Sequence, residues 1–260
     1  MSVALQPARL TGAIATAPAT LRFVGRYAAM PVVLAAVVVA TLLHVRGSDL
    51  DSIEQRRLGM GYMWQATLQH VALTVVSTVL VLAVAIPLGV LFTRRGMRRA
   101  APFAVAVFGI GQAVPSIGLL VLLTIVWTIG FWPAVVALVA YSMLPVLRNT
   151  MIGLSQVDEA VVESARGMGM SRRAVLTQIE LPLAVPVILA GLRTALVINV
   201  GTAALAALTD AGGLGTIIVA GLVQNRPLVT VVGSILTAAL ALFVDYLGRI
   251  AGDLLRPNGL

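Results

Sequence analysis

The chain has 260 residues, of which 59% are hydrophobic and 11% are charged, and its mean hydropathy is +1.01. Because soluble domains carry roughly 25% charged residues, this composition excludes an ordinary water-soluble protein. The net charge of +8 comes from arginine alone, since lysine is absent, and the absence of cysteine excludes disulfides and thiolate metal sites. In a membrane chain this positive balance is typical of cytoplasmic loops facing anionic lipid, not of nucleic-acid binding.

The apolar residues fall in long stretches, most of which are long enough to cross ~30 Å of hydrocarbon as helices. We therefore expect an all-α polytopic membrane protein with about six transmembrane helices. Two prolines divide the long apolar segment after residue 100, so that one span bends near Pro115 and the next begins near Pro133. In chain order, the predicted spans are 28–45, 69–93, 101–129, 133–147, 183–208 and 228–250. The first could instead be a signal peptide, but no clear cleavage site follows it.

The distribution of arginine predicts the orientation in the membrane. With both termini inside, thirteen of the eighteen arginines face the cytoplasm and four lie in outer loops. The cluster Arg94-Arg95-Gly96-Met97-Arg98-Arg99 marks one inner loop. By the positive-inside rule, residues 1–27 and the tail 251–260 are then cytoplasmic, and residues 28–250 form one multi-pass domain of the cell membrane.

A polar segment, 148–182, lies between the fourth and fifth spans. Ser155 followed by Asp158 can cap a first short helix, which the glycines at 167 and 169 would end. Ser171 can cap a second short helix, which we expect to stop at Pro182. Arg172 and Arg173 would lie in its first turn, where the helix dipole disfavours positive charge. They indicate either an external partner or simply a solvated basic loop; a DNA-reading helix pair would need companion helices.

The same segment resembles the EAA loop of binding-protein-dependent ABC importer permeases, written E-A-A-x3-G-x9-I-x-L-P. Every spacing is intact, and only the middle alanine is replaced, by serine. The matching residues are Glu163, Ser164, Ala165, Gly169, Ile179, Leu181 and Pro182. In that family this loop is the coupling helix that docks onto the ATPase, so the resemblance assigns ATPase coupling to these residues and to Arg172 and Arg173.

Further motifs narrow the resemblance to the osmoprotectant branch, which imports glycine betaine, carnitine or choline. They are Gly111-Gln112-Ala113-Val114-Pro115-Ser116, Leu144-Pro145-Val146-Leu147-Arg148-Asn149-Thr150, Gly167-Met168-Gly169-Met170, Gly191-Leu192-Arg193-Thr194-Ala195 and Ala211-Gly212-Gly213-Leu214-Gly215. Some are shared with methionine-type permeases, so an amino-acid importer is the alternative. The resemblance implies the type I ABC importer fold of the methionine permeases.

The resemblance also implies the partners: two ABC ATPase subunits, a second copy or paralogue of this permease, and an extracytoplasmic solute-binding protein, all at a lipid membrane. We expect this transport subunit to be no enzyme and to bind no cofactor, with ATP and Mg²⁺ on the ATPase. A Walker A loop needs a lysine, which the chain lacks. The alternative from another class, a stand-alone channel or secondary carrier, should show inverted repeats or a charged transport site.

Polar residues inside the predicted spans are candidates for the translocation path, although each can instead satisfy local backbone groups. These residues are Gln112, Pro115, Ser116, Arg193 and Asn199. Residues 211–215 and the apolar stretch after them predict a re-entrant turn or short outer helix. His44 and His70 lack a motif partner and are interpreted as interfacial side chains, so no metal site is expected.

Overall fold

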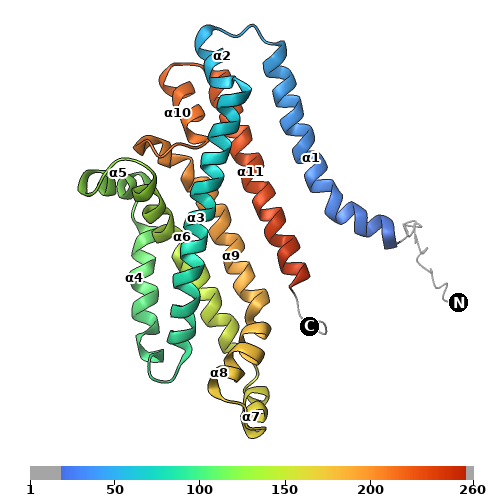
Figure 1. Cartoon of the computed structure of the whole chain (residues 1–260), viewed down its shortest axis with the longest axis vertical. Helices are drawn as coiled ribbons and strands as arrows, with labels where there is room; N and C mark the ends of the chain where they lie inside the picture. Colours follow the sequence, from blue (N-terminus) through green and yellow to red (C-terminus); the bar gives the residue numbers. More distant parts are fainter. Residues whose placement is uncertain (1–18, 256–260) are drawn as a thin grey trace, which may run out of the picture.

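The computed structural model describes residues 19–255, with side chains from residue 28 onward; the ends of the predicted cytoplasmic segments, residues 1–18 and 256–260, lie outside it. The described residues form an elongated bundle of helices without a strand (Figure 1). The helices are α1 (Ala19–Gly47), α2 (Ser52–Leu58), α3 (Met60–Thr93), α4 (Ala101–Ala113), α5 (Ser116–Val126), α6 (Phe131–Ser155), α7 (Glu159–Gly167), α8 (Arg172–Val175), α9 (Leu181–Ala203), α10 (Gly215–Val223) and α11 (Pro227–Leu254).

Among the described residues, five helices are long and apolar enough to cross a membrane, and a sixth span is possible if the bent pair α4 and α5 is counted as one. This confirms the predicted all-α membrane class. The helices extend beyond several of the predicted spans, because α3 begins at Met60 and α6 continues to Ser155. α6 therefore includes the first eight residues of the segment predicted as a loop.

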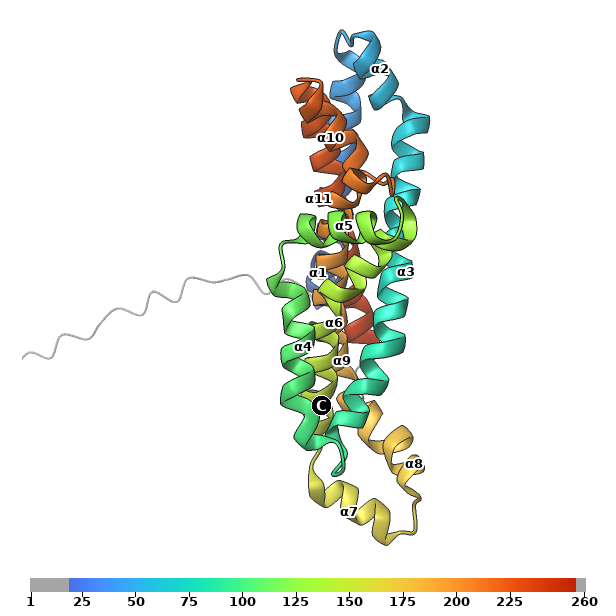
Figure 2. The same ribbon diagram turned by 90° about the vertical axis from the view of Figure 1, so that its left-hand side faces the viewer.

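The expected bend near Pro115 is a complete break. Val114 and Pro115 have extended backbones, with ψ of 135° and 129°, and α5 leaves at 92° to the axis of α4. Proline disfavours helical geometry at the residue before it, which explains why α4 ends there. α5 consequently lies across the bundle (Figure 2).

The core is centred on α6, which packs between α3, α4 and α9. Small residues let these helices approach closely, as is common in membranes, where burial of apolar surface gives no driving force. A Cβ on Gly89 of α3 would lie 2.6 Å from Thr150, and one on Gly153 of α6 would lie 3.1 Å from the carbonyl oxygen of Ala184. Across the same α6–α9 contact, Gly191 faces Asn149 and Pro145.

Large apolar side chains are exposed around the bundle, on α1, α3, α4, α5 and α11. A membrane span buries such side chains in lipid or against another subunit, so this exposure suits a bilayer rather than water. The connections fall into two groups at opposite ends of the molecule. α2 and α10 lie at one end, whereas the α3–α4 connection and the α7–α8 pair lie at the other (Figures 1 and 2).

The α6–α9 contact gives a first prediction. In Gly191→Ala the new Cβ would lie 2.7 Å from Asn149 Cβ and 2.8 Å from the Pro145 carbonyl oxygen, so the helices must separate. We expect this overpacking to cost about 1–3 kcal/mol and to lower the thermal unfolding temperature in detergent. Gly201→Ala is the matched control on α9, because nothing lies within 4 Å of its Cβ. Equal unfolding temperatures for the two variants would contradict the close α6–α9 contact.

Candidate functional site

α7 and α8 form a projecting pair of helices between α6 and α9 (Figures 1 and 2). The expected capping box, with Ser155 as the N-cap and Asp158 three residues later, was wrong: Asp158 itself is the N-cap, and its carboxylate accepts a hydrogen bond from the Ala160 N–H at 2.9 Å. Ser155 has a different role: it ends α6, and its hydroxyl donates to the Ile152 carbonyl at 2.9 Å. α7 is thus a separate helix set off from the bundle by a short turn.

Gly169 forms the turn after α7. Its φ is +87°, a left-handed conformation that side chains other than hydrogen disfavour. The Gly169 N–H donates to the Arg166 carbonyl at 2.9 Å, and the Met170 N–H donates to the Ala165 carbonyl at 3.2 Å. These two bonds define a Schellman motif, which explains the glycine at this position of the motif. Gly167, expected to share this role, lies inside α7.

The chain re-enters a helix at Ser171, whose hydroxyl accepts a hydrogen bond from the Ala174 N–H at 3.2 Å, as predicted. Arg172 and Arg173 lie exposed in the first turn. The expectation that this helix is short and stops at Pro182 was wrong. Helical structure runs without interruption from Arg172 to Ala203, through a π-helical turn at Leu176–Glu180.

The π turn explains how Pro182 fits within this continuous helix. Proline lacks an N–H and clashes with the preceding turn of an α-helix. Here Pro182 follows the π turn, at the beginning of α9, and the Leu181 N–H bonds to the Leu176 carbonyl, five residues back. The wider turn accommodates Pro182, so that α8, the π turn and α9 form one continuous helix, called here the α8–α9 rod.

The projecting pair has an inward and an outward face. Ala165 of α7 and Val175 of α8 are each 1% exposed, and the two helices contact one another. Ile179 and Leu181 are half-buried, at the base of the pair. The other predicted coupling residues are exposed: Glu163, Ser164, Gly169, Arg172, Arg173 and Pro182. Met168, which was not among the predicted residues, adds an apolar side chain to this face and is 76% exposed.

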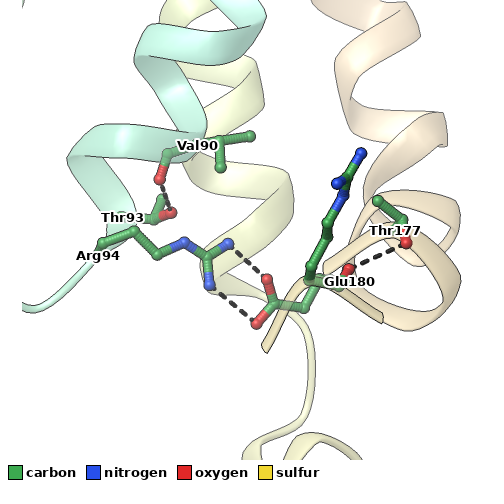
Figure 3. A network of polar contacts seen from close by, with 6 residues as sticks. Val90, Thr93, Arg94, Thr177 and Glu180 are labelled. Carbon is green, nitrogen blue, oxygen red and sulfur yellow. Dashed lines mark hydrogen bonds and ion pairs between the residues drawn. The ribbon is translucent and has the colours of Figure 1, made fainter. Parts of the chain in front are cut away.

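An ion pair that was not predicted fastens the base of α8 to α3. Glu180, 7% exposed, accepts two hydrogen bonds from the Arg94 guanidinium, at 3.2 Å and 2.5 Å (Figure 3). Arg94 follows the last residue of α3, and Glu180 occupies the unspecified position in I-x-L-P. The sequence contains only an indirect signal of this ion pair. Glu180 is an acidic residue between two apolar neighbours, and the arginine cluster that begins at Arg94 lies on the same predicted side of the membrane.

Gln112 and Ser116 flank the α4–α5 break at Pro115, as predicted, and their part in a solute path stays a prediction. The Gln112 amide donates to the Tyr141 carbonyl at 2.8 Å. Pro145, four residues after Tyr141 in α6, cannot donate to that carbonyl, so Gln112 replaces the missing helix bond. The Tyr141 hydroxyl in turn donates to the Val114 carbonyl, which joins the break to α6.

Arg193 and Asn199 contact different neighbours of α9. The Arg193 guanidinium donates to the Asp245 carboxylate of α11 at 2.7 Å and 3.2 Å. The Asn199 amide is fully buried and donates to the Thr78 hydroxyl of α3 at 3.0 Å. Both residues therefore have protein partners, and their part in a solute path stays a prediction.

At the opposite end, α10 confirms the short helix expected after residues 211–215. The Leu214 N–H donates to Nδ1 of His70 at 3.2 Å, and Nε2 of His70 lies 2.9 Å from the Val200 carbonyl. His70 is therefore completely buried and was wrongly interpreted as interfacial. Asp51 pairs with Arg226 at 2.7 Å, and a hydrogen bond from the Glu54 N–H lowers the pKa of Asp51.

No three His, Cys, Asp or Glu side chains between residues 19 and 255 are grouped so that they could hold a metal ion. The described polar groups instead form hydrogen bonds and ion pairs that join helices, as at Arg94, Arg193 and His70. The described residues therefore form a membrane bundle with one projecting pair of helices, α7 and α8.

Solved structures share this fold. The chain aligns with the methionine ABC transporter MetNI in its inward-facing conformation with a TM-score of 0.65 and 24% sequence identity, covering 76% of this chain and 98% of that one. A second structure of MetNI gives the same TM-score at 23% identity. The likeness confirms the expected type I ABC importer fold.

Curated relatives are more similar in sequence. The choline transport system permease protein OpuBB of Bacillus subtilis is 36% identical over 200 residues, covering 77% of this chain and 91% of the relative. The osmoprotectant import permease protein OsmY of Salmonella typhimurium is 36% identical over 222 residues, covering 85% and 93%. The glycine betaine/carnitine/choline permease protein OpuCD of Bacillus subtilis is 39% identical over 186 residues, covering 71% and 80%.

The model of one protein family, described as binding-protein-dependent transport system inner membrane component, matches residues 85–257. This range includes the projecting pair, the π turn and all of α9. The chain belongs to this family of inner-membrane permeases, the transport subunits of ABC importers.

Proposed function

We propose that this permease imports an osmoprotectant with a quaternary ammonium group, and that α7 and α8 receive the movement of a separate ATPase. The observation that carries the coupling part of this proposal is the direct continuity of α8 with α9. A partner that displaces the projecting pair must also move a 32-residue helix that enters the centre of the bundle. The exposed face of Glu163, Ser164 and Met168 is the docking surface in this account.

α9 can pass this movement to its neighbours. Gly191 and Ala184 bring α9 into close contact with α6, so the two helices move together or must separate. The ion pair between Arg193 and Asp245 joins α9 to α11. Movement at α8 would thereby change the packing of α6, α9 and α11, and open the path alternately to the two sides of the membrane.

The remaining partners follow from the two ends of the molecule. We place the ATPase, with its ATP and Mg²⁺, at the cytoplasmic end with α7 and α8, and the solute-binding protein at the outer end with α2 and α10. Both chain termini are cytoplasmic in this arrangement, and a second copy or paralogue of the permease completes the path. The α4–α5 break, with Pro115 and Ser116, and the polar residues Gln112, Arg193 and Asn199 remain our candidates along that path.

The solute class rests on the curated relatives, whose names specify choline, glycine betaine, carnitine or osmoprotectants. The solved structures belong to a methionine transporter, but at 24% identity or less they share the fold only. Quaternary ammonium groups are usually held in aromatic cages. Because only 5% of this chain is aromatic, we place solute recognition mainly in the binding protein.

The orientation can be tested with single cysteines, because the natural chain contains none. We expect Ser52→Cys of α2 to react with an impermeant maleimide added outside intact cells. Gly96→Cys, in the arginine-rich connection, should react only after the cytoplasmic face is opened. Labelling with the opposite sidedness would invert the proposed topology.

The solute class predicts a defect in uptake. Cells that lack this chain and all redundant importers should lose most accumulation of radiolabelled glycine betaine, carnitine or choline under osmotic stress. Methionine uptake should be unchanged and serves as the control. Normal betaine uptake combined with reduced methionine uptake would replace the osmoprotectant assignment with the amino-acid alternative.

If the ATPase docks on α7, substitutions of Gly169 should reduce ATPase binding more as the new side chain becomes larger. Gly169→Ala should assemble with the ATPase and transport, because nothing lies within 4 Å of its Cβ and the left-handed φ of +87° costs only about 1 kcal/mol. Gly169→Trp adds an indole to the exposed turn and should reduce co-purification of the ATPase by about tenfold or more. Both should unfold in detergent near the parent temperature. A tryptophan variant that assembles and transports normally would remove α7 from the ATPase interface.

A further inference from the structure

We infer that Arg94 is a positioning residue for energy coupling: its ion pair with Glu180 holds the base of the α8–α9 rod against α3, so that movement of the projecting pair turns the rod about a fixed point. This inference rests on the proposed ATPase docking at α7 and α8. It adds a role for two residues that the docking face does not include.

The position of the pair supports this role. Glu180 is the last residue of the π turn, so it lies at the junction between the projecting helix and the membrane rod. Arg94 directly follows α3, where the helix dipole favours a positive charge. The pair therefore joins the end of one long helix to the one irregular turn of another. π turns are frequent at functional sites, and here the tie lies at the turn itself.

The burial of the two side chains is unequal, and this asymmetry makes the inference testable. The Glu180 side chain is 9% exposed and the Arg94 side chain is 38% exposed. Removing the arginine would leave a buried carboxylate without its charge partner, which is the costly way to break such a pair. Removing the carboxylate charge would leave an arginine that water already reaches, which costs less. The two single substitutions should therefore differ in strength.

The groups around the Arg94–Glu180 ion pair also bear on whether it holds α9 in place. The pair borders an open cavity of about 550 Å³ between the ends of α3 and α6 and the beginning of α4, lined by both apolar side chains, such as Phe92 and Met151, and polar ones, such as Arg98 and Ser155. Thr177, one turn before Glu180, donates to the Arg173 carbonyl of its own helix at 3.0 Å (Figure 3). The ion pair with Arg94 is what joins Glu180 to a different helix, so in this proposal it sets the lateral position of the base of the rod.

The test uses the complete transporter, with its ATPase and binding protein, in proteoliposomes. For each variant, solute uptake, ATP hydrolysis and co-purification of the ATPase are measured. We expect Arg94→Gln to keep hydrolysis and assembly within about twofold while uptake per ATP hydrolysed falls about tenfold, a coupling change within the usual range of allosteric effects. Glu180→Gln should have a smaller effect. Arg95→Gln, at the exposed neighbouring arginine, is the matched control and should resemble the parent.

The double variant Arg94→Gln with Glu180→Gln gives the decisive comparison. Because both variants lack the same tie, uptake per ATP hydrolysed should stay about as low as in Arg94→Gln alone, although the double variant should unfold at a higher temperature because the unpaired buried carboxylate is gone. Arg94→Lys retains the charge but not the two-bond geometry, should fold, and should be intermediate in uptake per ATP.

Three results would overturn the inference. These are uptake per ATP in Arg94→Gln equal to that in Arg95→Gln, a double variant that regains the uptake per ATP of the parent, or uptake, hydrolysis and assembly falling in parallel, which indicates a purely structural pair. If Arg94→Gln does not fold, Arg94→Lys decides between the same outcomes. Failure of the parent chain to assemble with any ATPase would instead reject the proposed function.

Discussion

The close contact between α6 and α9 is the constraint on which the rest of the bundle depends. Gly153 and Gly191 remove side chains where the two backbones meet, so that the carbonyls of Ala184 and Pro145 can lie near the facing helix. In a bilayer, such contacts replace the apolar burial that drives folding in water. Because α9 is also continuous with α8, this close contact lies on the helix that leads to the projecting pair.

Three prolines, Pro115, Pro145 and Pro182, lie where the helices of this architecture break, lose a hydrogen bond or widen. Gln112 supplies the hydrogen bond that Pro145 withdraws from the Tyr141 carbonyl. The π turn before Pro182 accommodates the missing N–H at the entrance to α9. Val114 and Pro115 separate α4 from α5 completely. Hydrocarbon offers no water to satisfy freed backbone groups, which explains why partners such as Gln112 come from neighbouring helices.

The sequence was sufficient where the signal is local or compositional. Hydropathy predicted the membrane class, and the local turn and capping residues predicted the turn at Gly169 and the cap at Ser171. It was insufficient where two distant segments decide the outcome. The burial of His70 depends on the Leu214 N–H and the Val200 carbonyl, and the Arg94–Glu180 pair joins residues 86 positions apart. The continuity of α8 with α9 was missed because Pro182 was interpreted as a stop, whereas the π turn makes it compatible with the helix.

The central claim is that the α7–α8 pair contacts the ATPase during transport. A photoreactive crosslinker on Met168→Cys, at the exposed end of α7, measures this contact most directly in a chain with no other cysteine. The account predicts a crosslink to the ATPase whose yield changes between ATP-bound and nucleotide-free states, and no crosslink to the ATPase from Gln224→Cys beside α10. An ATPase crosslink from Gln224→Cys, or none from Met168→Cys in an actively transporting complex, would contradict it.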